Sequence, residues 1–325
     1  MRPASARRNE RLFWNGAATA DDGELDDLQR RAVGAYLGLA VGDALGATTE
    51  FLTPNEIRHR HGVHRDLVGG GWLHLRPGRV TDDTEMSLAL GRSILEQGCV
   101  DAHSVAEAFS VWMRGKPVDI GNTVRRGISH FRLTGEPRVA EDAHNAGNGA
   151  CMRCLPVALL HCFDDERELV DSSRRQAHVT HNSAVADAGS EAVLRMLVAA
   201  LHGRPLSALR THAMRLAARY PEYGFERRAV SNPSGWIVET LQVVFQALFT
   251  HKAFEDTLVD TVNRGGDADT TGAIAGMLAG AMYGVQAIPR RWLKTLDPEV
   301  ARQCRAQALQ LIELALAIRA RPAQG

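Results

Sequence analysis

Glycine recurs at every fourth position in two apolar segments of the chain, and this pattern limits the possible folds more than any other feature. One row comprises Gly34, Gly38, Gly42 and Gly46, and the other comprises Gly272, Gly276, Gly280 and Gly284. Residues four apart lie on one face of an α-helix, so each row predicts a flat surface that another backbone can approach closely. Each glycine costs up to about 1 kcal/mol of helix propensity relative to alanine. We therefore expect the two helices to touch, or to lie in one crowded helical core.

The remaining segments predict an all-α protein. Few of them show the alternation of a strand, and 325 residues are ample for a large core. We expect a single compact multi-helix domain over residues 25–325, preceded by a flexible extension over residues 1–24. Besides the two glycine-rich segments, the main predicted helices cover residues 87–95, 102–114, 123–133, 150–162, 180–201, 207–220, 232–249, 254–262 and 298–318.

Charge and cysteine content exclude several classes of function. Lys and Arg number 38, as do Asp and Glu, so no net charge attracts nucleic acid or an anionic membrane. The longest apolar run, residues 273–285, is too short and too glycine-rich to span a bilayer. Five cysteines, an odd number, favour reduced thiols and a cytoplasmic location. Cys151 and Cys154 have the spacing of half a zinc site, but no second pair completes it.

An acidic stretch directly precedes the second glycine row. Asp267 and Asp269 are followed by Thr270 and Thr271, with glycines on both sides. Such residues cap helix N-termini and complement the helix dipole. They are also the hard oxygen ligands that divalent cations prefer. The stretch alone does not decide between a cap and a metal site.

A second cluster has the same layout. Thr81, Asp82 and Asp83 open the helix predicted at residues 87–95. If the two helix ends converge, their side chains form a ligand set made only of oxygen, which suits Mg²⁺, Mn²⁺ or Ca²⁺ rather than zinc or copper. So many carboxylates would repel one another without cations, and their number favours more than one metal ion. We expect the same residues to cap their helices.

Three further positions are candidates with an ordinary structural alternative. Glu50 follows the first glycine helix and could reach the acidic stretch, or could be a surface residue. Asp119 precedes a glycine turn, where Asp is a common turn former. The loop of Gly147, Asn148 and Gly149 precedes the helix predicted at residues 150–162, and a helix N-terminus binds anions. His181 is open to three interpretations: ligand, substrate contact or capping neighbour.

Several spaced motifs together resemble the ADP-ribosylglycohydrolase family. They are residues 38–46 (GLAVGDALG), 81–84 (TDDT), 147–153 (GNGACMR) and 265–272 (GGDADTTG), and the similarity extends over roughly residues 30–315. The run from Gly69 to Gly91 resembles the branch of the family that acts on dinitrogenase reductase in nitrogen-fixing bacteria.

The resemblance implies an all-α hydrolase, a glycosidase with two divalent metal ions, Mn²⁺ or Mg²⁺, that removes ADP-ribose from a modified arginine. It assigns Thr81, Asp82 and Asp83 to one ion and Asp267, Asp269 and Thr270 to the other. Asp119 is implied as catalytic acid or base, and Glu50 as an acid beside the metals and the ribose. The ADP-ribose cleft is implied to be lined by Gly147, Asn148, Gly149, His181, Ser234, Gly235 and Trp236.

The resemblance also implies partners. The acceptor would be ADP-ribosylated dinitrogenase reductase, with control by a PII-type protein and transient recruitment to an ammonium-channel membrane protein. Two other functions stay open: hydrolysis of another arginine-modified protein or small ADP-ribose conjugate, and ADP-ribose binding without catalysis. The intact acidic clusters argue against the second, because a retired site has no reason to keep such repulsive charge.

Overall fold

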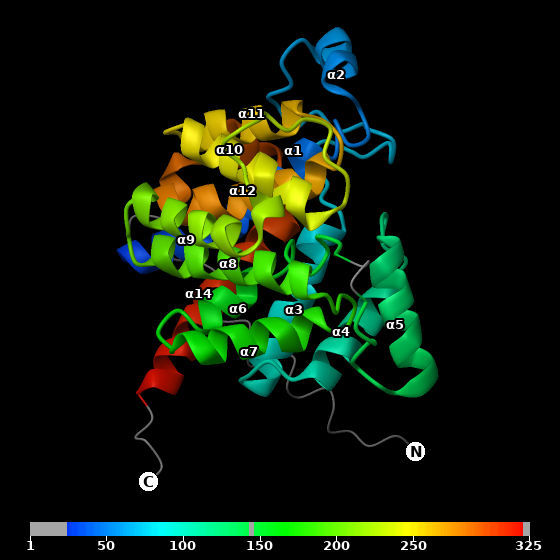
Figure 1. Ribbon diagram of the computed structural model, residues 1–325, viewed down its shortest axis with the longest axis vertical. Coiled ribbons are helices and arrows are strands. Elements are labelled where there is room, and N and C mark those ends of the chain that lie inside the picture. The colour runs from blue at the N-terminus through cyan, green and yellow to red at the C-terminus, as the bar shows by residue number, and fades with distance from the viewer. Residues whose placement is uncertain (1–24, 143–145, 321–325) are drawn as a thin grey trace.

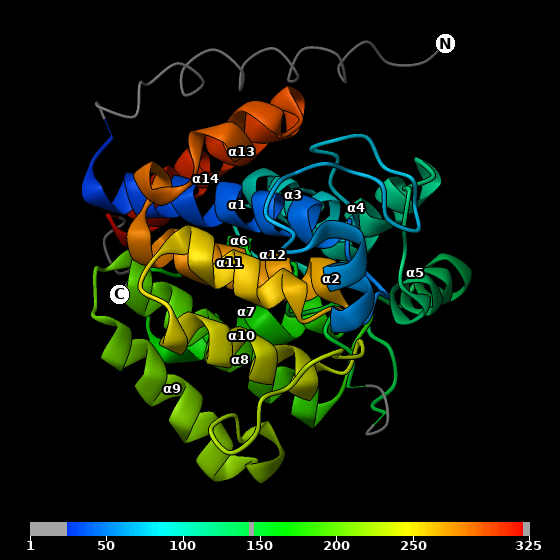
Figure 2. The ribbon, with the colours of Figure 1, turned by 90° about the horizontal axis from the view of Figure 1, so that it is seen from above.

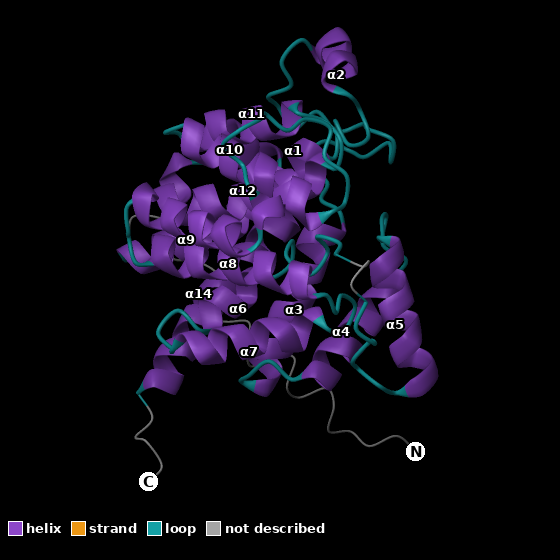
Figure 3. Ribbon diagram, viewed as in Figure 1, coloured by secondary structure: helices purple, strands orange, loops and turns teal. Residues whose placement is uncertain are grey.

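The computed structural model describes residues 25–142 and 146–320, and the extension expected at residues 1–24 lies outside them. Within these ranges the chain is helical and has no β-strand, so the all-α prediction is confirmed (Figure 3). The helices are α1 (Asp27–Gly46), α2 (Pro54–His61), α3 (Asp82–Gln97), α4 (Ala102–Arg114), α5 (Asn122–Thr134), α6 (Leu155–Leu160), α7 (Glu166–Ala177), α8 (Ala184–Leu201), α9 (Leu206–Arg219), α10 (Ile237–Thr250), α11 (Phe254–Asn263), α12 (Ala268–Tyr283), α13 (Arg290–Thr295) and α14 (Pro298–Arg319).

The two glycine helices, α1 and α12, pack directly against each other, as the first of the two sequence alternatives proposed. A Cβ atom on Gly38 would lie 2.2 Å from the carbonyl oxygen of Gly276, and one on Gly42 would lie 1.9 Å from that of Gly272. Distances this short leave no room for a side chain. The rows therefore exist because the two backbones are in contact at four successive glycines of α1, from Gly34 to Gly46.

The remaining helices enclose this pair. Figure 2 shows α13 and α14 on one side of α1, and α11, α10, α8 and α9 in succession on the other. Every residue of α1 from Ala32 to Gly46 is buried. The pair is thus the centre of the core. Figure 1 shows α2 at the top of the molecule and α4 beside α5 low on the right.

The helix expected at residues 150–162 is shorter in the structure, where only α6 is helical. The Asn148 carbonyl accepts the N–H groups of Cys151 and Met152 in a tight turn before α6. Arg153 is buried next to this turn, and its guanidinium donates to Gln176 and Thr180. The loop of Gly147, Asn148 and Gly149 therefore leads into a turn and not directly into a helix N-terminus.

Other boundaries differ less. α7 was not predicted, α8 begins at Ala184 rather than near residue 180, and α10 begins at Ile237 rather than 232. All five cysteines are free thiols, and Cys151 and Cys154 are buried. None of the helices described combines the length and the apolar character needed to cross a membrane.

Candidate metal centre and adjoining cleft

The N-termini of α3 and α12 converge on one point, as expected from their matching sequences. The Thr81 hydroxyl lies 3.4 Å from Oδ2 of Asp83 on its own helix and 3.5 Å from Oδ2 of Asp269 on α12. These three residues are buried. The two acidic clusters therefore form one oxygen-rich centre.

The side chains at the two N-cap positions do not cap their helices, so that part of the prediction is wrong. Thr81 precedes α3 and Asp267 precedes α12, and neither makes a side-chain cap hydrogen bond. Thr81 instead donates its hydroxyl to Asp43, while Asp267 accepts a 2.6 Å hydrogen bond from the Asn148 amide. The oxygens are directed into the centre rather than back to their own helices.

Glu50 joins the centre. One carboxylate oxygen from each of Glu50, Asp267 and Asp269 lies within 4.8 Å of the others. Glu50 and Asp269 are buried, and Asp267 is half-buried. The surface alternative for Glu50 is therefore wrong, because this side chain faces the acidic stretch.

A two-glycine turn brings these carboxylates together. Gly265 and Gly266 have φ angles of 71° and 66°, which glycine adopts without strain. The Gly266 carbonyl accepts the N–H of Phe51, and the Gly266 N–H donates to the Leu52 carbonyl. The Asp267 N–H donates to the Pro233 carbonyl on the opposite side. The turn is held between the segment that carries Glu50 and the segment that leads to residues 234–236.

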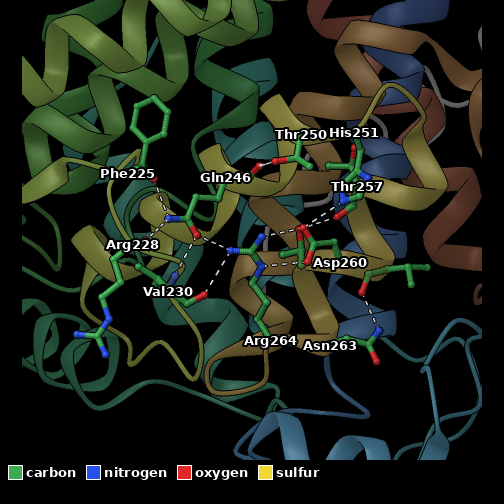
Figure 4. Close-up of polar contacts among 12 residues, drawn as sticks. Phe225, Arg228, Val230, Gln246, Thr250, His251, Thr257, Asp260, Asn263 and Arg264 are labelled. Carbon is green, nitrogen blue, oxygen red and sulfur yellow. Dashed lines mark hydrogen bonds and ion pairs between the residues drawn. The ribbon is translucent and has the colours of Figure 1, made fainter.

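A polar network behind the turn fixes it to α10 and α11 (Figure 4). Arg264 donates to both carboxylate oxygens of Asp260 and to Gln246 Oε1. The Gln246 amide donates to the carbonyls of Phe225 and Arg228. Arg264, which precedes the two glycines, is thus anchored on α11 through Asp260. Gln246 joins Arg264 to the loop before α10.

Trp72 holds Glu50, and sequence reasoning missed this role. The indole Nε1 donates a 2.6 Å hydrogen bond to Oε2 of Glu50. The loop of Trp72 reaches this position because Gly71 lies against the end of α1, where a Cβ would be 2.2 Å from the Ala47 carbonyl oxygen. The ring also contacts Phe51, with centroids 5.4 Å apart. The three consecutive glycines from Gly69 to Gly71 were the sequence feature that could have indicated this close approach.

Burial and mutual repulsion raise the pKa values of these carboxyl groups. Burial raises the pKa of Glu50 to about 8, with the charges of Asp267 and Asp119 adding to it and the Trp72 hydrogen bond opposing it. Burial and the neighbouring Asp119 raise the pKa of Asp82 to about 8. The pKa values of Asp83 and Asp269 are also well above the ordinary range, first because of burial and then because of nearby carboxylates.

The centre fits a hard divalent cation. Its donors are carboxylate and hydroxyl oxygens, the ligands that Mg²⁺ and Mn²⁺ take. Asp83 Oδ1 is buried and has no hydrogen-bond partner among the described residues, which is costly for a carboxylate oxygen. A cation would supply the missing partner and relieve the repulsion that raises the pKa values.

Asp43 is a second residue that sequence reasoning missed. It lies within the glycine row of α1, is fully buried, and accepts hydrogen bonds from the backbone and hydroxyl groups of Thr81 and Thr84. Burial raises its pKa to about 6, and these four donors oppose the shift. Asp43 therefore ties the start of α3 to α1. A carboxylate inside an apolar helix was the signal, since a buried charge needs partners.

The loop of Gly147, Asn148 and Gly149 lies beside the centre. Its backbone pairs with the segment before α10 through a bridge between Gly147 and Trp236 and a 3.0 Å hydrogen bond from the Asn148 N–H to the Gly235 carbonyl. The Asn148 amide holds Asp267 and also donates to Thr240. The structure thus gives Asn148 a supporting role that the sequence did not indicate.

His181 faces this loop, with its Nε2 beside Gly147 and Gly149. The N-cap of α8 is Ser183, two residues further along the chain. The Thr180 hydroxyl accepts from Arg153 and lies 2.8 Å from His181 Nδ1, where either atom can be the donor. Burial lowers the pKa of His181 to about 3, so the ring is neutral near pH 7.

The other expected site residues lie at the edge of the centre. Asp119 is half-buried and its Oδ1 accepts the Ile120 N–H. Burial raises its pKa, and its charge in turn raises the pKa values of Glu50 and Asp82, so Asp119 lies near both. The Ser234 hydroxyl is bonded to Glu239 at the start of α10, whereas Trp236 is exposed.

Comparison with known proteins identifies the class. The family model of ADP-ribosylglycohydrolases matches residues 24–323, and the chain belongs to this family. It is 48% identical over 285 residues to the ADP-ribosyl-[dinitrogen reductase] glycohydrolase of Rhodospirillum rubrum, covering 88% of this chain and 96% of that protein.

Two further matches agree. The ADP-ribosylarginine hydrolase Tri1 of Serratia proteamaculans is 33% identical over 82% of this chain and 75% of its own length. A solved structure titled "ADP-ribosylglycohydrolase-related protein complex" superposes with a TM-score of 0.78 at 35% identity, covering 90% of this chain and all of that one. The sequence resemblance and the expected fold are therefore confirmed.

Proposed function

We propose that this chain is a metal-dependent hydrolase that removes ADP-ribose from a modified arginine of dinitrogenase reductase. The observation that carries the proposal is the single oxygen-rich centre formed by α3 and α12, with a buried Asp83 oxygen that lacks a partner among the described residues. The 48% identity to the Rhodospirillum rubrum glycohydrolase, over nearly the whole of both chains, supports the acceptor.

Two divalent ions, Mn²⁺ or Mg²⁺, fit the distribution of the ligands. Thr81, Asp82 and Asp83 would hold one ion, and Asp267, Asp269 and Thr270 the other. Asp269 would contribute to holding both ions, since its carboxylate lies 3.5 Å from the Thr81 hydroxyl of the other ligand set. Such ions supply Lewis-acid stabilisation of oxygen ligands and a lower pKa for bound water.

The protein residues would divide the remaining tasks. Water adds to C1 of the ribose as the bond from C1 to the guanidinium nitrogen breaks. The electron pair of that bond leaves with the nitrogen, so the guanidine departs neutral while positive charge develops on the sugar. The Asp119 carboxylate would take the proton that the water loses and return it to the departing guanidine, which yields free ADP-ribose and a protonated arginine. Burial raises the pKa of Asp119, which makes the carboxylate a better proton acceptor than an exposed aspartate. Glu50, held by Trp72, positions the ribose hydroxyls.

The residues beside the centre would bind the rest of ADP-ribose. The imidazole of His181 and the backbone of Gly147 and Gly149 offer hydrogen-bonding groups to a diphosphate or ribose. Gly235 has its Cα beside Asp267, where an added Cβ would be 3.5 Å from Oδ2. Exposed Trp236 offers a ring at the rim. Ser234 would contribute through its backbone, because Glu239 occupies its hydroxyl.

One assay tests the function and its acceptor. The protein with Mn²⁺ is incubated with ADP-ribosylated dinitrogenase reductase and, separately, with another arginine-ADP-ribosylated protein, and free ADP-ribose is measured. We expect release from the first substrate. Release from both would support the broader activity suggested by the hydrolases named Tri1, and release from neither would refute the proposal in favour of ADP-ribose binding alone.

An Asp119→Asn variant tests the division of roles. We expect it to bind Mn²⁺ as the wild type does, because the assigned ligands are unchanged, while turnover falls by at least about 100-fold. Isothermal titration with Mn²⁺ and a single-turnover assay measure the two properties separately. Full turnover in this variant would remove Asp119 from the mechanism.

Cellular context completes the proposal. The five free cysteines favour the cytoplasm. Control by a PII-type protein and recruitment to an ammonium-channel protein remain predictions, which co-purification with each partner would test.

A further inference from the structure

A charged groove lies outside the metal centre, on the face of α8. Figure 1 shows α8 between α9 and α7, and the groove between them has a volume of about 840 Å³. Its floor follows one face of α8, where alanine recurs every fourth residue at Ala184, Ala188 and Ala192. Small floor residues leave the space between the flanking helices open.

The acidic groups on the floor are already paired. Glu191 forms ion pairs with Arg174 at 2.8 Å and with Arg195 at 3.4 Å. Asp187 lies 2.9 Å from His178 Nε2. The side chains of Asp187 and Glu191 are only 13% and 11% exposed. Both carboxylates therefore already have partners within the groove.

The rim has unpaired cations on three sides. Arg175 on α7, Arg215 on α9 and Arg138 in the loop before residue 142 are exposed, and none makes an ion pair or hydrogen bond with another described residue. Two acids also lie at the rim, Glu141 and Asp171, and Asp171 lies 3.8 Å from Arg167. The rim thus presents more free guanidinium groups than free carboxylates, in a chain whose net charge is zero.

The groove adjoins the loop beside the metal centre. Asn182 lines the groove, and its side-chain amide donates to the Val139 carbonyl while its backbone carbonyl accepts the Asp142 N–H. The preceding residue, His181, faces Gly147 and Gly149. One short segment therefore links the groove to the loop whose Asn148 holds Asp267.

We propose that this groove is a docking site for an acidic surface segment of the protein that bears the modified arginine. This inference rests on the proposed function. Free guanidinium groups around an open groove complement carboxylates on a partner protein and fix the orientation in which that partner binds. A small anion seated in the groove would meet the buried carboxylates of Asp187 and Glu191, whereas a protein surface bridges the arginines on the rim above them.

A neutralised variant tests the proposal. Arg175→Gln/Arg215→Gln removes two free rim charges, and Arg92→Gln/Arg290→Gln removes two exposed arginines that do not line the groove. We expect KM for ADP-ribosylated dinitrogenase reductase to rise about tenfold at low salt in the groove variant alone. Its kcat, and both constants for free ADP-ribosylarginine, should match the wild type. An unchanged KM for the protein substrate, or an equal loss with the small substrate, would overturn the docking site.

Binding measured without turnover separates this proposal from the proposed function. If the wild type releases no ADP-ribose from either substrate, the function fails, but the Kd for the immobilised ADP-ribosylated protein still tests the groove. We expect that Kd to weaken about tenfold in the groove variant and to stay constant in the control. Equal Kd values would refute docking. So would pyrophosphate binding that the groove variant loses while its affinity for the protein is unchanged, because the groove would then be a small-anion site.

Discussion

At the scale of single residues, the hydrogen bond between Trp72 and Glu50 gives a sharp test of the centre. Trp72→Phe keeps an aromatic ring beside Phe51 but removes the N–H that holds the carboxylate. Because a hydrogen bond to a charged group contributes about 1.5 to 3 kcal/mol, we expect kcat to fall at least about tenfold. Since this bond lowers the pKa of Glu50, the acidic limb of the rate profile should also move to higher pH.

Steady-state rates across the pH range measure both effects. Phe51→Leu is the matched control, because it removes the ring contact and leaves the indole N–H in place; we expect it to keep the wild-type profile. A Trp72→Phe enzyme with an unshifted profile would show that the hydrogen bond does not tune Glu50.

Residue roles were only partly predictable from the sequence. The acidic residues of the centre were identifiable because hard oxygen ligands cluster at two helix starts. The roles of Asn148 and Ser234 were not, because their partners, Asp267 and Glu239, depend on side-chain geometry that spacing does not encode. Asp43 was hidden by its position within a glycine row, although a buried carboxylate there requires donors.

At the scale of elements, the contact between α1 and α12 predicts a steep cost for any side chain in the glycine rows. Gly38→Ala would place a Cβ 2.2 Å from the Gly276 carbonyl oxygen. Backbone on both sides has little freedom to move, so the gain in helix propensity is outweighed and the free energy of unfolding should fall by about 3 kcal/mol or more. Urea unfolding followed by circular dichroism measures the change.

Gly121→Ala is the comparison, since its φ is −59° and the nearest atom to an added Cβ is 4.0 Å away. We expect its free energy of unfolding to differ from the wild type by less than about 1 kcal/mol. Equal stability of the two variants would mean that α1 and α12 can move apart without loss of stability. That result would contradict tight packing of the two backbones.

The same elements show where sequence reasoning succeeds. The glycine rows predicted the helix contact because a four-residue period is a property of one helix face. The prediction of one helix over residues 150–162 was wrong, although the apolar content of this segment is compatible with a helix. The turn that follows Asn148 is instead fixed by the burial of Arg153 against Gln176 and Thr180. Contacts between distant segments overrode the local pattern there.

At the scale of the whole molecule, the acidic centre should couple stability to pH and to metal. Glu50 has an ordinary pKa of 4.5 that folding raises to about 8, and Asp82 rises from 3.8 to about 8. At pH values between the ordinary and the raised pKa, Glu50 and Asp82 stay protonated in the folded protein but are ionised in the unfolded chain. Each increase in pH across this window therefore lowers the free energy of unfolding of the metal-free protein.

We expect a loss on the order of 3 kcal/mol for each of the two groups between about pH 5 and about pH 8 after chelation. Mn²⁺ should restore more stability at the upper end than at the lower, because cations bind the ionised carboxylates and compete with protons. Thermal unfolding of chelated and Mn²⁺-loaded protein across this range gives the comparison. In Glu50→Gln/Asp82→Asn the decline should flatten, because two of the groups that keep protons are gone. If chelated wild-type protein were as stable near pH 8 as near pH 5, the carboxylates would be ionised without a cation, and the repulsion inferred for this centre would be wrong.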